Sequence, residues 1–355
     1  LVMIIRKIFS LAASIISLFI FVLFIITNSI SDENNIKYYS GDEGILSLMY
    51  HRFNEHKYPS TNIQMNVFEK QMEIVQKSNY IFSDPKEFDK NFNSPKTNKE
   101  ILITIDDAFL SFYLDAWPYL KKNKIPFILF VSTEPVGKRG YMTWDQIKEI
   151  EAEKFAVIGH HSHSHGYLID KDNDFFISDI EKANEIFLKN LGYIPNLFSY
   201  PFGEYSKFMR DYISQNFDYA FGQHSGVIDV NKDKFELPRF PINENYGDLK
   251  RFKSVINSFP LEYIQLFPRE KKLTKRTNPP KFKVKFFKKQ KNIENVNCYS
   301  NELNEWKQSD TNFNNHTLII KFRGPFKPRR GRVNCSLNDN GKWRWFGIQF
   351  PIQDN

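Results

Sequence analysis

Residues 155–165, FAVIGHHSHSH, decide how the rest of the chain is interpreted. The apolar run at the start of this segment is typical of a short buried strand. His161 and His165 follow four residues apart, so one turn of helix or a tight loop directs both rings at a single point. Two imidazoles in this arrangement suit a divalent cation such as zinc, which needs at least one more protein ligand. The segment therefore predicts half of a metal site at the end of a strand.

The missing ligand is expected upstream, where the apolar run 101–105, ILITI, ends in Asp106 and Asp107. Parallel strands bring their carboxyl ends to one edge of a sheet, where α/β proteins bind ligands. Each feature alone has a simpler explanation, because an Asp pair after a strand often caps the next helix and an H-x-x-x-H pair is a weak motif. Together, at two strand ends of one chain, they favour a metal site shared between two strands.

Three motifs in chain order, TIDD (104–107), HSHSH (161–165) and FSYPFGEY (198–205), resemble those of the polysaccharide deacetylases, carbohydrate esterase family four, with its NodB-homology domain. The segment LMYH (48–51) is similar to the branch that de-N-acetylates poly-N-acetylglucosamine-type exopolysaccharides. The resemblance covers roughly residues 42–265. It implies an α/β fold, a distorted (β/α) barrel. Strand-like and helical segments that alternate along this region independently favour parallel βα units.

The family also implies a role for each motif residue. Asp107, His161 and His165 would hold one divalent ion, Zn²⁺ in the first place, and Asp106 would be the catalytic base. The backbone N–H of Phe202, in a Pro-aromatic-Gly turn, would stabilise the oxyanion of the reaction. His160 and His163 match no ligand position of the family.

Two family features are missing here. Most members carry an arginine two residues before the motif proline to orient the base, and this chain has Ser199 there; we expect Arg239 to take over. A late Leu-x-His motif, which supplies the general acid, is also absent. His51, in the branch with a permuted motif order, is our candidate, and His224 is the alternative. Candidate substrate-binding residues are Tyr200, Trp144, His224 and Arg239.

The N-terminus indicates an exported protein. Arg6 and Lys7 precede an uncharged apolar run, 8–26, that is long for a signal peptide and about long enough to span a bilayer. We predict a signal anchor or signal peptide at 1–30 and a polar tether at 31–43, with positive charge retained inside. The protein would then be anchored in the inner membrane facing the periplasm, or periplasmic or secreted if the segment is cleaved.

Charge is distributed unevenly along the chain. The net charge is +8, but residues 268–292 alone hold eleven Lys and Arg against one acid, so the remainder is almost neutral. Such a run is most often a solvated linker, which we place at 266–292 after a catalytic domain at 44–265. Contact with an anionic lipid or polysaccharide is the alternative, and the expected compartment excludes nucleic acid. The 41% hydrophobic composition excludes global disorder.

The C-terminal segment, 293–355, has short alternating strands with Asn- and Gly-rich turns, which predicts a small all-β, sandwich-like module. Its aromatic residues could bind sugar or form its core. The two cysteines, Cys298 and Cys335, lie in strand-like contexts and could pair in an oxidising compartment; the sequence leaves both questions open. The aromatic residues concerned are Trp343, Trp345 and Phe346.

These observations predict a metal-dependent polysaccharide deacetylase that hydrolyses N-acetyl groups of hexosamine units in a bacterial surface or exported glycan. The alternative is a non-catalytic carbohydrate-binding or glycan-assembly protein that retains the fold. Asp106 favours the enzyme, because a protein that only binds has no use for a second, non-ligand carboxylate. The sequence identifies neither the glycan, the native metal nor the oligomeric state.

Overall fold

The structure is a computed structural model that describes residues 41–42, 44–94, 99–288, 290–327 and 329–353. The predicted anchor or signal peptide at 1–30 and almost all of the predicted tether lie outside these residues. Within them, no helix is both long enough and apolar enough to cross a membrane. They belong to one compact unit, Ser40–Asn355.

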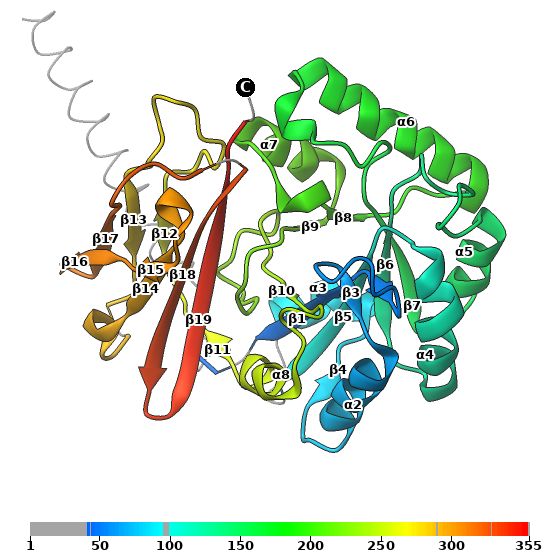
Figure 1. Cartoon of the computed structure of the whole chain (residues 1–355), viewed down its shortest axis with the longest axis horizontal. Helices are drawn as coiled ribbons and strands as arrows, with labels where there is room; N and C mark the ends of the chain where they lie inside the picture. Colours follow the sequence, from blue (N-terminus) through cyan, green and yellow to red (C-terminus); the bar gives the residue numbers. More distant parts are fainter. Residues whose placement is uncertain (1–40, 43, 95–98, 289, 328, 354–355) are drawn as a thin grey trace, which may run out of the picture. The chain divides into compact units, whose positions relative to one another are not determined.

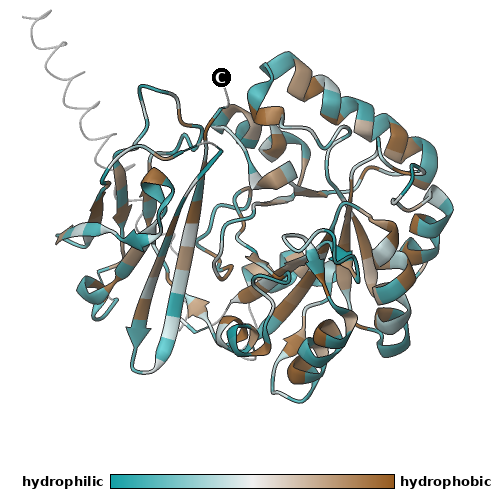
Figure 2. Cartoon of the chain, in the orientation of Figure 1, coloured by the Kyte–Doolittle hydropathy of each residue, from teal (hydrophilic) through white to brown (hydrophobic). Residues whose placement is uncertain are grey.

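An eight-stranded sheet organises the first two thirds of this unit (Figure 1), and its strands pair in parallel throughout. The order is β10-β1-β5-β6-β7-β8-β9, with β4 beside β5, so the sheet is an open path. Figure 2 shows these strands as mainly hydrophobic, as expected for a parallel sheet covered on both faces. The strands are β1 (Ile45–Tyr50), β4 (Ile81–Phe82), β5 (Glu100–Asp106), β6 (Phe127–Val131), β7 (Ala156–His160), β8 (Leu197–Ser199), β9 (Tyr219–Phe221) and β10 (Phe240–Pro241).

Helices follow the strands and lie around the outside of the sheet (Figure 1). Helix α5 begins with a capping box between Thr143 and Gln146, and α6 ends at Gly192, whose φ of 82° suits a glycine. The α-helices are α2 (Met65–Gln76), α3 (Phe88–Asn93), α4 (Trp117–Asn123), α5 (Trp144–Glu151), α6 (Asn173–Leu191), α7 (Lys207–Asn216) and α8 (Leu249–Ile256). Shorter turns of helix are η1 (Pro85–Glu87), η2 (Phe112–Ala116), η3 (Leu168–Asp170), η4 (Pro201–Gly203), η5 (Ile293–Asn295) and η6 (Glu302–Asn304).

Gly159 sets how closely β6 and β7 approach each other. A Cβ atom at this position would lie 2.4 Å from the ring of Phe130 on β6. The glycine therefore lets the large aromatic ring pack against the strand that leads into the histidine-rich segment, and it fixes where that segment leaves the sheet.

The C-terminal part is all-β, with a five-stranded sheet, β11-β19-β18-β14-β15, and a four-stranded sheet, β12-β13-β17-β16. Both sheets contribute side chains to one apolar cluster, as in a sandwich. The strands are β11 (Phe259–Pro260), β12 (Gln265–Phe267), β13 (Phe282–Lys285), β14 (Asn297–Ser300), β15 (Lys307–Gln308), β16 (Asp310–Asn314), β17 (Thr317–Lys321), β18 (Arg330–Asp339) and β19 (Lys342–Pro351), and a separate pair is β2 (Arg52–Phe53) with β3 (Asn62–Ile63).

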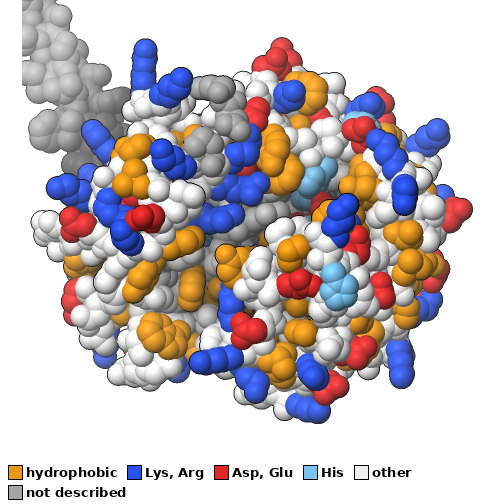
Figure 3. All heavy atoms as spheres, in the orientation of Figure 1, with side chains coloured by type: hydrophobic (Ala, Val, Ile, Leu, Met, Phe, Trp, Pro, Cys, Tyr) orange, Lys and Arg blue, Asp and Glu red, His pale blue; other side chains and the backbone are white. Residues whose placement is uncertain are grey.

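The basic segment 266–292, for which the sequence predicts a linker, takes part in this β structure. It supplies β13 and most of β12, and Phe282 and Val284 are fully buried while Lys283 and Lys285, which alternate with them, are exposed. Figure 3 shows Lys and Arg side chains gathered over the C-terminal strands, on the left of the view. Part of the charge, Lys283 and Lys285, is therefore carried on the exposed face of a strand. The domain boundaries themselves stay predictions.

The aromatic residues of the module have different roles. Phe346 is 1% exposed and belongs to the module's core. Trp345 packs in a T-shaped contact against Phe240 of β10, with ring centroids 5.9 Å apart. Trp343 is 51% exposed, so among these three it alone retains a ring free for contact with sugar.

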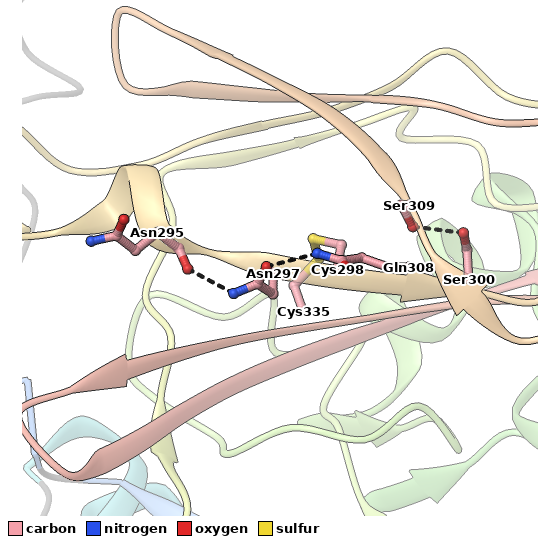
Figure 4. Close-up of a disulfide and its surroundings, with 7 residues drawn as sticks. All are labelled: Asn295, Asn297, Cys298, Ser300, Gln308, Ser309 and Cys335. Carbon is pink, nitrogen blue, oxygen red and sulfur yellow. Dashed lines mark hydrogen bonds between the residues drawn. A yellow bond between two sulfur atoms is a disulfide. The ribbon is translucent and has the colours of Figure 1, made fainter.

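Cys298 and Cys335 form a disulfide (Figure 4) that joins directly opposed positions of β14 and β18. The bond closes a sequence separation of 37 residues. Both cysteines are fully buried in the core shared by the two C-terminal sheets. The question that the sequence leaves open is thus resolved in favour of pairing.

We expect the double variant Cys298→Ser/Cys335→Ser to lower the free energy of unfolding by about 2–4 kcal/mol, because an unfolded chain without the cross-link gains entropy. Urea denaturation of the oxidised wild type and the variant measures the difference. Reduced wild type is the control and should match the variant within about 1 kcal/mol. Equal stability of all three forms would contradict a stabilising bond.

Candidate active site

The carboxyl ends of neighbouring strands of the eight-stranded sheet bring the predicted site residues together. Asp106 ends β5 and Asp107 follows it, His161 follows β7 directly, and His51 follows β1. Because β5 lies between β1 and β6, and β6 pairs with β7, these residues gather at one edge.

Three ligand atoms converge at this edge. The Oδ1 atom of Asp107 lies 3.3 Å from His161 Nε2 and 2.9 Å from His165 Nε2. All three residues present atoms within 4.8 Å of one another. Asp107 Oδ1 and His161 Nε2 are buried, and neither has a hydrogen-bond partner with acceptable geometry within the described part of the chain. Buried polar atoms left in this way fit a bound cation, which satisfies lone pairs that face one another.

A hydrogen bond fixes the tautomer of His161. Its Nδ1 atom lies 2.7 Å from the carbonyl oxygen of Ser199, which only accepts, so Nδ1 carries the proton and Nε2 presents its lone pair toward Asp107. Asp107 and His161 are buried, whereas the side chain of His165 is 22% exposed. The ligand set is thus closed toward the core and open toward solvent on the side of His165, as a catalytic metal site requires.

Electrostatics and backbone strain mark the same residues. Burial alone would raise the pKa of Asp107, but the histidines around it, His165 first, hold that pKa well below its usual value. Burial would lower the pKa of His165, and the Asp107 carboxylate outweighs this and raises it. Asp107, Ser162 and His165 have φ values of 76°, 68° and 50°. Non-glycine residues in this left-handed region are uncommon and concentrate at functional sites.

Asp179 on α6 holds the histidine-rich loop in this conformation. Its carboxylate accepts hydrogen bonds from the backbone N–H of His163, at 2.8 Å, and of Ser164, at 3.0 Å. Asp179 is only 5% exposed, and the sequence analysis does not identify it. The sequence did contain a signal for Asp179, because it is the single acid among the buried apolar residues of an amphipathic helix.

Asp106 is held by Arg239 in a fully buried, bidentate ion pair. The two guanidinium N–H₂ groups donate to Oδ1 and Oδ2 of Asp106 at 2.7 and 2.8 Å. Arg239 also donates to the hydroxyls of Ser199 and Thr104 and to the carbonyl of Gly222. Burial would raise the pKa of Asp106, but the charge and hydrogen bonds of Arg239, together with His161 and His51, outweigh this and lower it. The carboxylate is therefore ionised and fixed in orientation.

The two candidate general acids lie in different surroundings. His51 Nε2 is 3.9 Å from Asp106 Oδ2, on the same edge of the sheet, and burial lowers the pKa of His51. His224 is 7% exposed, and burial together with the neighbouring Lys271 lowers its pKa to about 3. Of these two candidates, His51 is the one that lies close enough to Asp106 to take part in the same reaction.

The turn Pro201–Gly203 brings Phe202 against a predicted metal ligand. Phe202 has a φ of 58°, and its ring lies 4.7 Å from that of His165 and 4.2 Å from that of Tyr167, measured between centroids. The amides of Gly203 and Glu204 donate within the turn, to Tyr200 and Pro201. Phe202, whose backbone is strained, is thus the residue of the turn that lies against the predicted metal ligand His165.

Two predicted substrate-binding residues lie away from the ligand set. Tyr200 is fully buried, and its hydroxyl donates to the carbonyl of Phe235. Trp144 packs on Phe187 and lines an open pocket of about 590 Å³ behind the histidine-rich loop, together with His163, whose Nδ1 lies 2.8 Å from a threonine hydroxyl. His160 is fully buried among phenylalanines, which lowers its pKa to about 3.

Comparison with known proteins gives matches to polysaccharide deacetylases. The polysaccharide deacetylase family model matches residues 93–220. The poly-beta-1,6-N-acetyl-D-glucosamine N-deacetylase of Staphylococcus aureus (strain N315) is 24% identical over 201 residues, 52% of this chain and 69% of the relative. The Bacillus subtilis protein YxkH, whose name assigns it to the polysaccharide deacetylases, is 26% identical over 165 residues, 45% of this chain and 57% of YxkH.

Solved structures confirm the expected fold class. IcaB from Ammonifex degensii has 26% sequence identity and a TM-score of 0.53, covering 60% of this chain and 97% of that chain. The Streptococcus pyogenes deacetylase PplD in complex with acetate has a TM-score of 0.55 at 21% identity, covering 61% and 99%, and shows the fold alone. Residues 93–220 of this chain thus match the polysaccharide deacetylase family, the family that the sequence motifs resemble.

Proposed function

We propose that this protein is a metal-dependent polysaccharide deacetylase that hydrolyses N-acetyl groups of hexosamine units in a bacterial surface or exported glycan. The observation that carries the proposal is the pair of unlike carboxylates at one strand end. Asp107 faces two imidazoles, whereas Asp106, held by Arg239, stays outside that set at 3.9 Å from both His161 and His51. A binding protein has no need for this second, oriented carboxylate.

Amide hydrolysis needs a base for the attacking water, stabilisation of the oxyanion and an acid for the departing amine. A divalent ion held by Asp107, His161 and His165, Zn²⁺ by the chemistry of these donors, would polarise the substrate and acidify a water. Asp106, ionised and fixed by Arg239, accepts the proton of the attacking water. The Phe202 backbone N–H donates to the oxyanion, and His51 delivers a proton to the amine.

The substrate class rests on relatives and on the expected location. One set of relatives is named for deacetylation of poly-beta-1,6-N-acetyl-D-glucosamine, which supports an N-acetylhexosamine polymer as the substrate here. Export and attachment to a membrane rest on the apolar run 8–26 of the sequence. Trp343, the exposed aromatic residue of the C-terminal module, is a further candidate for contact with the polymer.

Two substitutions separate metal binding from catalysis. We expect Asp106→Asn to retain one metal ion per chain and to lower kcat for acetate release by about 10²–10⁴-fold, because the base is lost and the ligands remain. We expect His161→Ala to lose the metal. Metal analysis of the purified protein and an acetate assay on N-acetylglucosamine oligomers measure both. Metal binding without acetate release from any glycan by the wild type would favour a binding protein.

Removing Arg239 should destabilise the fold. In Arg239→Met the Asp106 carboxylate stays buried without its counter-charge, and we expect the free energy of unfolding at pH 7 to fall by about 3–5 kcal/mol. The matched control is Arg210→Met, which breaks a partly exposed pair with Asp233 and should cost about 1 kcal/mol or less.

The pH dependence of this loss has a defined sign. Without Arg239 the pKa of Asp106 rises, so in the variant Asp106 takes up a proton at a higher pH than in the wild type. Protonation removes the unpaired buried charge, and the difference in unfolding free energy between wild type and variant therefore becomes smaller in acid. Urea denaturation between neutral and acidic pH measures the gap. A gap that stays constant or widens in acid would contradict the ion pair as its cause.

The general acid is tested with two histidine variants. We expect His51→Ala to lower kcat by about 10²-fold with the metal retained, because of the two candidate acids it is His51 whose ring lies 3.9 Å from Asp106. His224→Ala should keep kcat within about threefold, since the neighbouring groups that act most on His224 are Lys271 and Glu236, which are not part of the proposed site. The reverse pattern would assign the role to His224.

A further inference from the structure

A strand of the C-terminal module reaches the turn that we assign to the oxyanion. The side-chain amide of Gln349, on β19, donates to the carbonyl oxygen of Phe202 at 3.0 Å and to that of Gly203 at 3.2 Å. Gln349 is 2% exposed, so water does not replace these bonds. Its neighbour Ile348 points the opposite way, into the core of the module. One face of β19 thus serves the module and the other contacts the turn.

The start of β18 holds the same turn through charge. Glu204, the residue after the turn, is 3% exposed and accepts from Arg330 Nε at 2.8 Å and from Arg329 at 3.2 Å. The guanidinium of Arg330 lies 5.4 Å from the Phe202 ring centroid, and that of Arg329 lies 3.8 Å from the ring centroid of Tyr167, which stacks on Phe202. The middle and the C-terminal end of the turn are therefore held by β19 and by the residues at the start of β18.

The turn needs such support because its backbone is strained. Phe202 has a φ of 58°, a conformation that a residue with a side chain rarely adopts unless its surroundings impose it. On the other side, the turn is pressed against Gln223, since a Cβ atom on Gly203 would lie 2.5 Å from the Gln223 nitrogen. Gln349 and the Gln223 segment thus confine it from two directions. An oxyanion donor is effective only when it is held in place before the reaction.

We propose that Gln349 and Arg330 are positioning residues that hold the Phe202 amide in its oxyanion-binding orientation, so that the C-terminal module completes the active site. This inference rests on the proposed deacetylase function. It gives the module a role that does not depend on binding sugar. It also explains why β18 and β19 are the longest strands of the described chain, since they extend from the module's core to the turn.

The test compares Gln349→Leu and Gln349→Met with Ile348→Val. Both changes at Gln349 keep its approximate size and remove the donor, whereas the change at Ile348 weakens the module's core without touching the turn. For the Gln349 variants we expect kcat for acetate release to fall about 10–100-fold, with KM within about threefold and metal content unchanged. Arg330→Gln, at a partly exposed position, should lower kcat in the same direction.

A second readout does not depend on activity. Hydrogen exchange of the Gly203 and Glu204 amides, which close the turn, should accelerate at least about tenfold in Gln349→Leu and stay unchanged in Ile348→Val. Unchanged exchange in all Gln349 and Arg330 variants would overturn the inference. So would an equal loss of kcat in Ile348→Val at a matched melting temperature, since the effect would then be one of stability. If the wild type releases no acetate, the proposed function fails and the exchange result still decides this inference.

Discussion

Asp107 Oδ1 faces His161 Nε2 and His165 Nε2 across distances of 3.3 and 2.9 Å. Leaving a buried acceptor unsatisfied costs about 1–3 kcal/mol, and here two of the three atoms are buried and lack a partner within the described residues. A folded chain tolerates this arrangement when a cation completes it. The left-handed backbone conformations of Asp107 and His165 add strain at two of the same three ligand residues. The fold around the site therefore has to impose a geometry that these residues would not adopt alone.

The supporting contacts come from elements far apart in the sequence. Ser199 on β8 fixes the tautomer of His161, Asp179 on α6 holds the loop amides, and Arg239 orients Asp106. The parallel sheet makes this possible, because it lines up the carboxyl ends of its strands and the residues that follow them. Gln349, in the C-terminal hairpin of β18 and β19, makes a contact of the same kind with the Phe202 turn on the other side of the site. Each contact restricts a group that the reaction needs in one orientation.

Much of this was predictable from the sequence, for identifiable reasons. Apolar runs that end in chemically specific residues indicated the strand ends, so the convergence of Asp107, His161 and His165 could be predicted. Arg239 could only be proposed, because its contact with Asp106 spans 133 residues and has no local pattern. Asp179 was missed although it is the single acid on the buried face of α6, because its contacts with the amides of His163 and Ser164 have no pattern in the sequence. The buried strand in the basic segment was hidden by lysines that alternate with Phe282 and Val284.

The most direct test of the account is a crystal structure of the protein grown with Zn²⁺, with anomalous diffraction data collected at the zinc absorption edge. The account predicts one strong anomalous peak at the carboxyl ends of the strands of the eight-stranded sheet. The peak should lie about 2.0–2.2 Å from Asp107 Oδ1 and from the Nε2 atoms of His161 and His165. The absence of a peak there, or a peak held by other residues with these three pointing apart, would contradict the central claim.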